Sequence, residues 1–208
     1  MSIYVLAGTN GAGKSSIGGA MIRAAGADYF NPDEAARHIL DANPGATIAE
    51  ANSAAWLGGK RLLERAIVEH GNFAFETTLG GATITKLLAS AMDAGIDVHV
   101  WYVALNSPDL HIARVQARVS RGGHDIPERD IRRRYDASRH NLIELLPRLA
   151  SLRVYDNSND ANPAAGVTPT PVLLLHTEHG RIVHRCDPAS APEWAKPILL
   201  IAFSNAKQ

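Results

Sequence analysis

A phosphate-binding motif, Gly-Thr-Asn-Gly-Ala-Gly-Lys-Ser, occupies residues 8–15 and follows an apolar run at Ile3–Ala7. It satisfies every fixed position of the pattern G-x-x-x-x-G-K-[ST], in which glycines let backbone N–H groups face phosphate oxygens. The lysine of this pattern supplies charge to the β- and γ-phosphates, and the final hydroxyl can bind Mg²⁺. We therefore expect ATP and Mg²⁺ here, with Ser15 as a metal ligand. The residues expected to hold the nucleotide are Gly8, Thr9, Asn10, Gly11, Ala12, Gly13, Lys14, Ser15 and Ser16.

Two carboxylates come directly after apolar segments. Asp33 follows a short run that ends at Phe30, and Glu76 follows Phe73–Phe75. Ligands of α/β proteins bind beside the carboxyl ends of strands, so Asp33 is predicted to contact an acceptor or to accept the proton of its hydroxyl. It could instead only stabilise a helix N-terminus. Glu76 is expected to hold the acceptor or a Mg²⁺-bound water, although a surface carboxylate at a strand end is the alternative. Thr77 and Thr78 could bind acceptor hydroxyls or merely cap the next segment.

Arginines are concentrated between residues 114 and 139. Arg114, Arg118 and Arg121 are spaced by four and three residues, so they share one helix face. Glycines at 122 and 123 break that helix, and three more arginines follow at 132–134. This pattern predicts a mobile lid over about residues 112–140 that closes on the triphosphate. A solvated basic hairpin that pairs with nearby carboxylates is the alternative. We expect Lys14, Asp33, Arg118 and Arg121 to be catalytic, and Arg114 and Arg118 to contact the nucleotide.

The elements that must position these residues alternate between short apolar runs and helical patterns. Strands are predicted at 3–7, 27–30, 73–75, 98–105 and 152–155, and helices at about 15–25, 32–40, 47–70, 83–94, 108–121 and 127–149. Such alternation indicates an α/β fold of three layers with a mostly parallel, five-stranded sheet. We expect residues 1–160 to form a P-loop kinase-like domain. Residues 161–208 would form a C-terminal extension, with a connector and a β-hairpin packed on the same domain.

Composition favours a small-molecule partner. The 208 residues include 21 basic and 21 acidic side chains, so the formal net charge is zero, whereas general nucleic-acid binders usually carry a basic excess. The single cysteine, Cys186, cannot form an intramolecular disulfide, which suits a reducing cytoplasm. No stretch approaches the roughly 20 apolar residues of a membrane helix. We therefore expect a cytoplasmic protein without a membrane partner. The three tryptophans are assigned to packing.

Taken in order, these motifs resemble the zeta-toxin-like P-loop kinases, and most closely the bacterial branch labelled "predicted ABC-type ATPase". The resemblance covers roughly residues 1–160. It rests on the phosphate loop together with Asn31–Glu34, Phe73–Leu79, Arg114–His124, Ile126–Glu128, Arg133–Tyr135, Asn141-Leu142 and Val154–Ser158.

This resemblance implies a kinase that uses ATP to phosphorylate the 3′-hydroxyl of UDP-N-acetylglucosamine. It places the catalytic aspartate on Asp33, the acceptor-binding Glu and Thr on Glu76 and Thr78, and a nucleotide contact on Asn157. One of the family's two lid arginines falls near Arg114 or Arg118. At the place of the other stands His124, which is expected to contact the acceptor, and Arg121 or Arg134 could replace the missing guanidinium.

The sequence leaves two other functions open. The chain could be an ATP-binding toxin or switch module controlled by a partner protein such as an antitoxin. It could also be a polynucleotide kinase, against which the neutral net charge argues.

Overall fold

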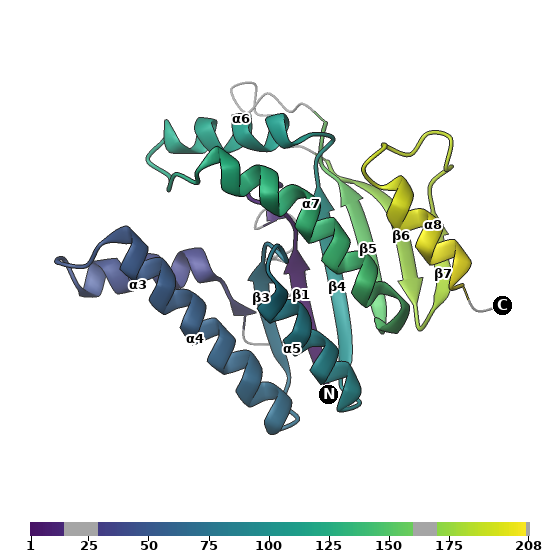
Figure 1. Cartoon of the computed structure of the whole chain (residues 1–208), viewed down its shortest axis with the longest axis horizontal. Helices are drawn as coiled ribbons and strands as arrows, with labels where there is room; N and C mark the ends of the chain where they lie inside the picture. The colour runs from purple at the N-terminus through teal and green to yellow at the C-terminus, as the bar shows by residue number, and fades with distance from the viewer. Residues whose placement is uncertain (15–28, 160–169, 207–208) are drawn as a thin grey trace.

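The computed structural model describes residues 1–14, 29–159 and 170–206. Within these residues, seven strands form one sheet in the order β2-β3-β1-β4-β5-β6-β7 (Figure 1). Strands β1 to β5 pair in parallel, while β6 runs antiparallel to β5 and β7 antiparallel to β6. The strands are β1 (Ser2–Ala7), β2 (Tyr29–Phe30), β3 (Phe73–Thr77), β4 (Asp97–Ala104), β5 (Ser151–Asp156), β6 (Val172–Glu178) and β7 (Arg181–Arg185).

The predicted α/β class and its five parallel strands are confirmed. The C-terminal hairpin was also predicted. It is part of the sheet itself, because β6 pairs along the length of β5 and the hairpin extends the sheet to seven strands. Pairing satisfies the edge of β5 that would otherwise present free N–H and C=O groups. The helix predicted at residues 15–25 lies outside the described residues.

The described helices are α3 (Pro32–Ala42), α4 (Ile48–Val68), α5 (Ala82–Asp93), α6 (Pro108–Val119), α7 (Glu128–Leu145) and α8 (Lys196–Ser204). In Figure 1, α5, α7 and α8 lie over one face of the sheet, and α3 and α4 lie beyond the β2 edge. Helix α3 begins where the Asn31 side chain accepts hydrogen bonds from the N–H groups of Asp33 and Glu34, at 2.9 and 3.4 Å. Helix α4 begins at a capping box between Thr47 and Glu50. None of the described helices is both long and apolar enough to cross a membrane.

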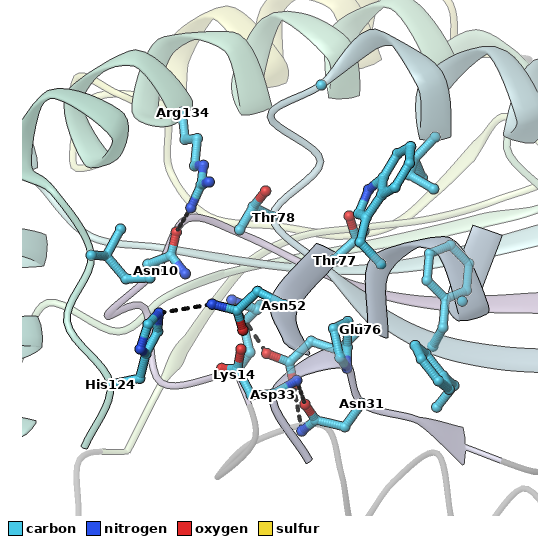
Figure 2. Close-up of a pocket in the computed structure, with 18 of the residues that line it drawn as sticks. Asn10, Lys14, Asn31, Asp33, Asn52, Glu76, Thr77, Thr78, His124 and Arg134 are labelled. Carbon is cyan, nitrogen blue, oxygen red and sulfur yellow. Dashed lines mark hydrogen bonds and ion pairs between the residues drawn. The ribbon is translucent and has the colours of Figure 1, made fainter. Parts of the chain in front are cut away.

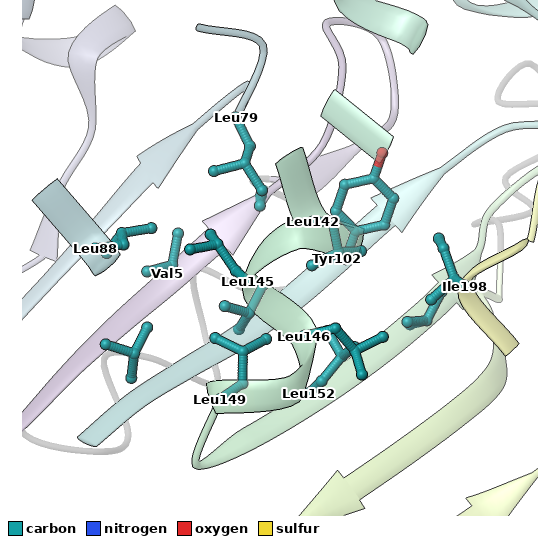
Figure 3. Packing of buried hydrophobic residues seen from close by; sticks show 14 of the residues in the cluster. Val5, Leu79, Leu88, Tyr102, Leu142, Leu145, Leu146, Leu149, Leu152 and Ile198 are labelled. Atoms are coloured by element: carbon teal, nitrogen blue, oxygen red, sulfur yellow. The ribbon is translucent and has the colours of Figure 1, made fainter. Parts of the chain in front are cut away.

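The main hydrophobic cluster lies between the sheet and helices α5, α7 and α8, and Leu63 and Ala66 of α4 also belong to it (Figure 3). Val5 and Tyr102 contribute from central strands, Leu142 from α7 and Ile198 from α8, and all four are buried. Helix α8 was not among the predicted helices. It carries its apolar side chains into the same cluster as the parallel strands, so the C-terminal part shares their core.

Candidate active site

A cavity of about 730 Å³ opens beside the carboxyl ends of β2, β3 and β1. Its walls come from the phosphate loop, the strand ends, α4, the start of α5, and helices α6 and α7, which form the segment predicted to be a lid (Figure 2). Twelve of the residues predicted for the site line it: Asn10, Gly11, Gly13, Lys14, Asp33, Glu76, Thr77, Thr78, Arg114, Arg118, His124 and Arg134. The fold therefore brings together segments separated by more than a hundred residues of chain.

The phosphate loop has a backbone that favours glycine at three of its positions, of which Gly8 and Gly13 are examples. Gly8 has a φ of +142°, and a Cβ there would lie 2.0 Å from the carbonyl oxygen of Val103. A Cβ on Gly13, at φ +83°, would lie 2.6 Å from Nδ2 of Asn157. That same Nδ2 donates a hydrogen bond of 2.9 Å to the carbonyl oxygen of Ala12. Asn157 was predicted to contact the nucleotide. The structure places it buried behind the loop, which it holds from the β5 side, and not among the described residues that line the cavity.

Not every loop residue faces the cavity. Gly8, Thr9 and Ala12 are buried within the loop, where they shape its backbone rather than line the cavity. Ser15, the predicted Mg²⁺ ligand, and Ser16, which follows the motif, lie outside the described residues.

A buried ion pair joins the phosphate loop to β3. The Nζ atom of Lys14 lies 3.4 Å from Oε1 of Glu76, and the two side chains are only 7% and 10% exposed. The other oxygen, Oε2, accepts a hydrogen bond of 2.9 Å from the Tyr29 hydroxyl and one of 3.5 Å from Nδ2 of Asn31. Both carboxylate oxygens are therefore satisfied inside the protein, as a buried charge requires.

The second carboxylate has a different setting. Asp33 stands in the first turn of α3 with its side chain 60% exposed, and Oδ2 lies 4.0 Å from a guanidinium nitrogen of Arg118. Arg118 also donates a hydrogen bond of 2.8 Å to the carbonyl oxygen of His124, so its guanidinium reaches the lid loop as well. An exposed carboxylate with one loose partner is available to accept a proton from a ligand.

Two contacts tie the lid helices to the phosphate loop through Asn10. Arg134 of α7 donates a hydrogen bond of 2.8 Å to Oδ1 of Asn10, visible in Figure 2. His111 of α6 is fully buried, and its Nδ1 lies 2.8 Å from the carbonyl oxygen of Asn10, which must accept. Burial lowers the pKa of His111 to about 4, so the imidazole is neutral near pH 7. Burial is also the main cause that lowers the pKa of the Arg134 guanidinium.

The remaining predicted residues divide between cavity and surface. The hydroxyl oxygens of Thr77 and Thr78 accept hydrogen bonds from the N–H groups of Leu79 and Gly80, at 3.1 and 3.4 Å, and both threonines also line the cavity. They therefore cap the next segment and face the ligand space. Arg114 lines the cavity and donates to the carbonyl oxygen of Asn159 at 3.3 Å. Arg121 is exposed and lies outside the set of described residues that line the cavity.

Sequence reasoning missed one wall of the cavity, which is a stripe of α4 at Asn52, Trp56 and Lys60. A spacing of four residues places these side chains on one face of a helix, and this spacing could have revealed the stripe. Trp101 and Trp194 are buried, but Trp56 is 44% exposed on the cavity wall, so assigning all three tryptophans to packing was wrong. Nδ2 of Asn52 lies 3.1 Å from Nε2 of His124, so α4 touches the lid loop (Figure 2).

Comparison with known proteins identifies the family of this chain. The model of the zeta toxin family matches residues 2–162. The chain belongs to the zeta toxin family. The matched region holds every site residue described above, whereas β6, β7 and α8 lie beyond it. An uncharacterized protein of Haemophilus influenzae is 34% identical over 132 residues, which are 62% of this chain and 88% of that protein.

Solved structures share the fold of this zeta toxin family member. The complex of AvrRxo1-ORF1 and -ORF2 with ATP gives a TM-score of 0.65 at 17% identity, covering 97% of this chain. This chain spans 63% of that one, less than two thirds of its length. A structure of the PezAT chromosomal toxin–antitoxin system of Streptococcus pneumoniae gives a TM-score of 0.55 at 14% identity, over 82% of this chain and 73% of that one. At such identities, the likeness shows a common fold.

Proposed function

We propose that this zeta toxin family member is an ATP- and Mg²⁺-dependent kinase that phosphorylates a hydroxyl of a small acceptor, with a nucleotide sugar such as UDP-N-acetylglucosamine as its substrate. One observation carries the proposal: a single cavity joins the phosphate-loop lysine, an exposed carboxylate and a buried carboxylate. Lys14, Asp33 and Glu76 all line it. A nucleotide switch needs no second ligand space with its own carboxylates, whereas a kinase needs an acceptor site and a base.

The donor nucleotide fits the loop side of the cavity. The glycine backbone of the loop and the buried ammonium of Lys14 suit phosphate oxygens, and Arg114 and Arg118 reach the same space from α6. Mg²⁺ would be held by Ser15 and would neutralise charge on the phosphates. One of the structures that share this fold, the AvrRxo1 complex, was solved with ATP, which supports the same donor here.

The acceptor hydroxyl would lie between Asp33 and Glu76. Its oxygen attacks the γ-phosphorus, a new O–P bond forms, and the bond from the γ-phosphorus to the bridging oxygen of ADP breaks. Asp33 accepts the hydroxyl proton, and Arg118 stabilises the negative charge on the transferred group. Glu76, Thr77 and Thr78 orient the acceptor. Asn157 supports the nucleotide through its bond to the loop.

The α4 stripe supports an acceptor of nucleotide size. Along two turns of helix it offers an amide at Asn52, an indole at Trp56 and, at Lys60, an ammonium that pairs with Glu64 at 2.5 Å. A flat base can stack on the exposed indole, and an ammonium can pair with phosphate. The cavity of about 730 Å³ is within the usual range of ligand sites and extends from the phosphate loop to this stripe. These features favour a nucleotide sugar over a small sugar.

A partner protein is a further part of the proposal. The PezAT structure belongs to a toxin–antitoxin system, and the AvrRxo1 structure is a complex of two gene products. An antitoxin that covers the cavity of this chain would control its activity. Reduced growth of cells that express the wild-type chain, but not Lys14→Met, would support a toxin; equal growth of the two would count against one.

A phosphotransfer screen tests the kinase itself. The protein, ATP and Mg²⁺ would be incubated with UDP-sugars, free sugars, nucleosides and short oligonucleotides, and products read by mass. We expect a UDP-sugar to gain one phosphoryl group. Labelling of oligonucleotides alone would establish a polynucleotide kinase instead. ATP binding without transfer to any acceptor would leave the nucleotide switch and exclude our proposal.

A further inference from the structure

The carboxylate of Glu76 is held from two sides by groups of different character. Oε1 faces the Lys14 ammonium at 3.4 Å, which is a charge that ATP will compete for. Oε2 faces the Tyr29 hydroxyl at 2.9 Å, a neutral donor that a nucleotide has no reason to displace. Asn31 assists the tyrosine at 3.5 Å. Oε1 therefore contacts a cation that ATP also binds, whereas Oε2 contacts neutral donors that ATP does not bind.

The sheet explains why Tyr29 reaches Glu76. Strand β2 pairs in parallel with β3, with Tyr29 opposite Ala74. Glu76 is two residues further along β3, and since side chains alternate along a strand, it projects to the same face as Ala74. Tyr29 and Glu76 are thus diagonal neighbours on one face, a distance that a tyrosine side chain can span.

Binding of ATP changes the balance at this pair. The phosphate-loop lysine is needed at the β- and γ-phosphates, so Oε1 of Glu76 loses its cation while the residue stays 8% exposed. A buried carboxylate that loses a neighbouring cation becomes less stable, and a hydrogen bond to the charged group offsets part of that loss. We propose that Tyr29 is a positioning residue that holds Glu76 in place while Lys14 passes from Glu76 to the phosphates of ATP. Oε1 then accepts a hydrogen bond from the acceptor, a consequence that rests on the proposed kinase function.

Nucleotide binding alone tests the exchange, without any acceptor. The affinity for a non-hydrolysable ATP analogue with Mg²⁺ would be measured by calorimetry in wild type, Tyr29→Phe, Glu76→Gln and the double variant. We expect Tyr29→Phe to weaken binding by about threefold to tenfold, since the hydroxyl matters most once Lys14 has left. In the Glu76→Gln background the same change should have no effect, because no charge is left to stabilise. Equal effects in both backgrounds would overturn the proposal.

Matched controls separate this role from simple packing and simple charge. Tyr4 packs on the same hydrophobic cluster as Tyr29, so Tyr4→Phe should leave the affinity unchanged. Asp33 is a carboxylate in the same cavity that pairs with Arg118 instead, so the effect of Tyr29→Phe should persist in the Asp33→Asn background. Should Tyr29→Phe not fold, Glu76→Gln alone remains a test: it must tighten analogue binding more than Asp33→Asn does, and equal tightening would contradict the exchange.

The outcomes also separate this proposal from the kinase assignment. If the binding cycle behaves as expected but no acceptor is ever phosphorylated, the lysine exchange stands and the kinase function fails. If phosphotransfer occurs but the cycle is additive, Tyr29 is a packing residue in a working kinase. In an active enzyme, we expect Tyr29→Phe to raise the KM of the acceptor more than it lowers kcat, because Glu76 orients the acceptor rather than reacting with it.

Discussion

The cavity contains two ion pairs whose surroundings differ. The pair at the sheet, Lys14 with Glu76, is about nine-tenths buried and has hydrogen-bonding neighbours in Tyr29 on β2 and Asn31 at the start of α3. The pair at the predicted lid, Arg118 of α6 with Asp33 of α3, is 41% and 60% exposed and spans 4.0 Å. Solvent screens the second pair, so it contributes little to stability and can exchange partners readily. The sheet thus holds the first pair in a fixed geometry, while the second pair is open to solvent and, in the proposed reaction, is the one free to rearrange around the phosphates.

The largest expected effect is on the phosphotransfer rate, when the arginine of the exposed pair is removed. Arg118→Met should lower the phosphotransfer rate by about 10³–10⁵, the range for an arginine that stabilises the transferred phosphoryl group. Its melting temperature should stay near that of wild type, since the side chain is partly exposed. Arg133→Met, on the exposed face of α7, is the matched control and should keep the rate. Loss of rate in both variants would mean that general basic charge, not position, matters.

His111, which is buried against the phosphate loop, should make the stability of the protein depend on pH. The pKa of His111 is about 4 in the folded protein against 6.5 as its ordinary value, so the unfolded chain binds a proton first as the pH falls. The contribution of His111 to the free energy of unfolding is therefore fully present above pH 6.5. As the pH falls towards 4, roughly 3 kcal/mol of it is progressively lost. Urea unfolding of His111→Asn across this range should show a shallower fall. His140→Asn, exposed on α7, should follow the wild-type curve. Parallel curves for wild type and His111→Asn would exclude this anchor.

A smaller expected effect is a difference in stability between variants of the buried pair and variants of the exposed pair. Lys14→Met leaves the Glu76 carboxylate buried without its cation, so we expect the free energy of unfolding to fall by about 2 kcal/mol. Arg118→Met should change it by less than ~0.5 kcal/mol, as is usual for exposed sites. Chemical denaturation of both variants, without nucleotide, measures the difference. If the arginine variant lost as much stability as the lysine variant, the contrast between the two pairs would not hold.

The smallest effect concerns the contact between α4 and the lid loop. Asn52→Ala removes the 3.1 Å contact with His124, and because both groups are near the surface we expect the melting temperature to stay constant. Hydrogen–deuterium exchange at residues 121–126 should nevertheless increase, since the loop loses a restraint. Arg61→Ala, on the exposed face of α4, is the control and should leave that exchange unchanged. Unchanged exchange in Asn52→Ala would show that the contact does not restrain the lid.

Much of the fold followed from local signals. The apolar runs predicted the parallel strands, and the glycine pattern located the loop whose positive φ angles the structure displays. Helix α8 escaped prediction because its run is apolar on nearly every side, without the periodicity of a surface helix. The arrangement of the site was harder to predict from the sequence. Asp33 and Glu76 could be placed by their strand ends, but the partnership of Tyr29 with Glu76 depends on the pairing of β2 with β3, which no local pattern encodes.

The lid illustrates the same limit. Spacing placed Arg114, Arg118 and Arg121 on one helix face, yet the structure turns the first two to the cavity and leaves Arg121 at the surface beside the break at Gly122. The docking of α6 and α7 on the phosphate loop through Asn10 decides this, and it links residues more than a hundred positions apart. Arg134, one of three successive arginines, is the member that reaches the loop.

The central claim is that Asp33 and Lys14 serve one phosphotransfer reaction. The most direct measurement is single-turnover transfer from ATP to UDP-N-acetylglucosamine by wild type and Asp33→Asn, together with ATP affinity for both. We predict that Asp33→Asn binds ATP at least as well as wild type and transfers its phosphate about 10²–10⁴ times more slowly, the usual loss for a general base. Equal transfer rates in the two proteins would contradict the account.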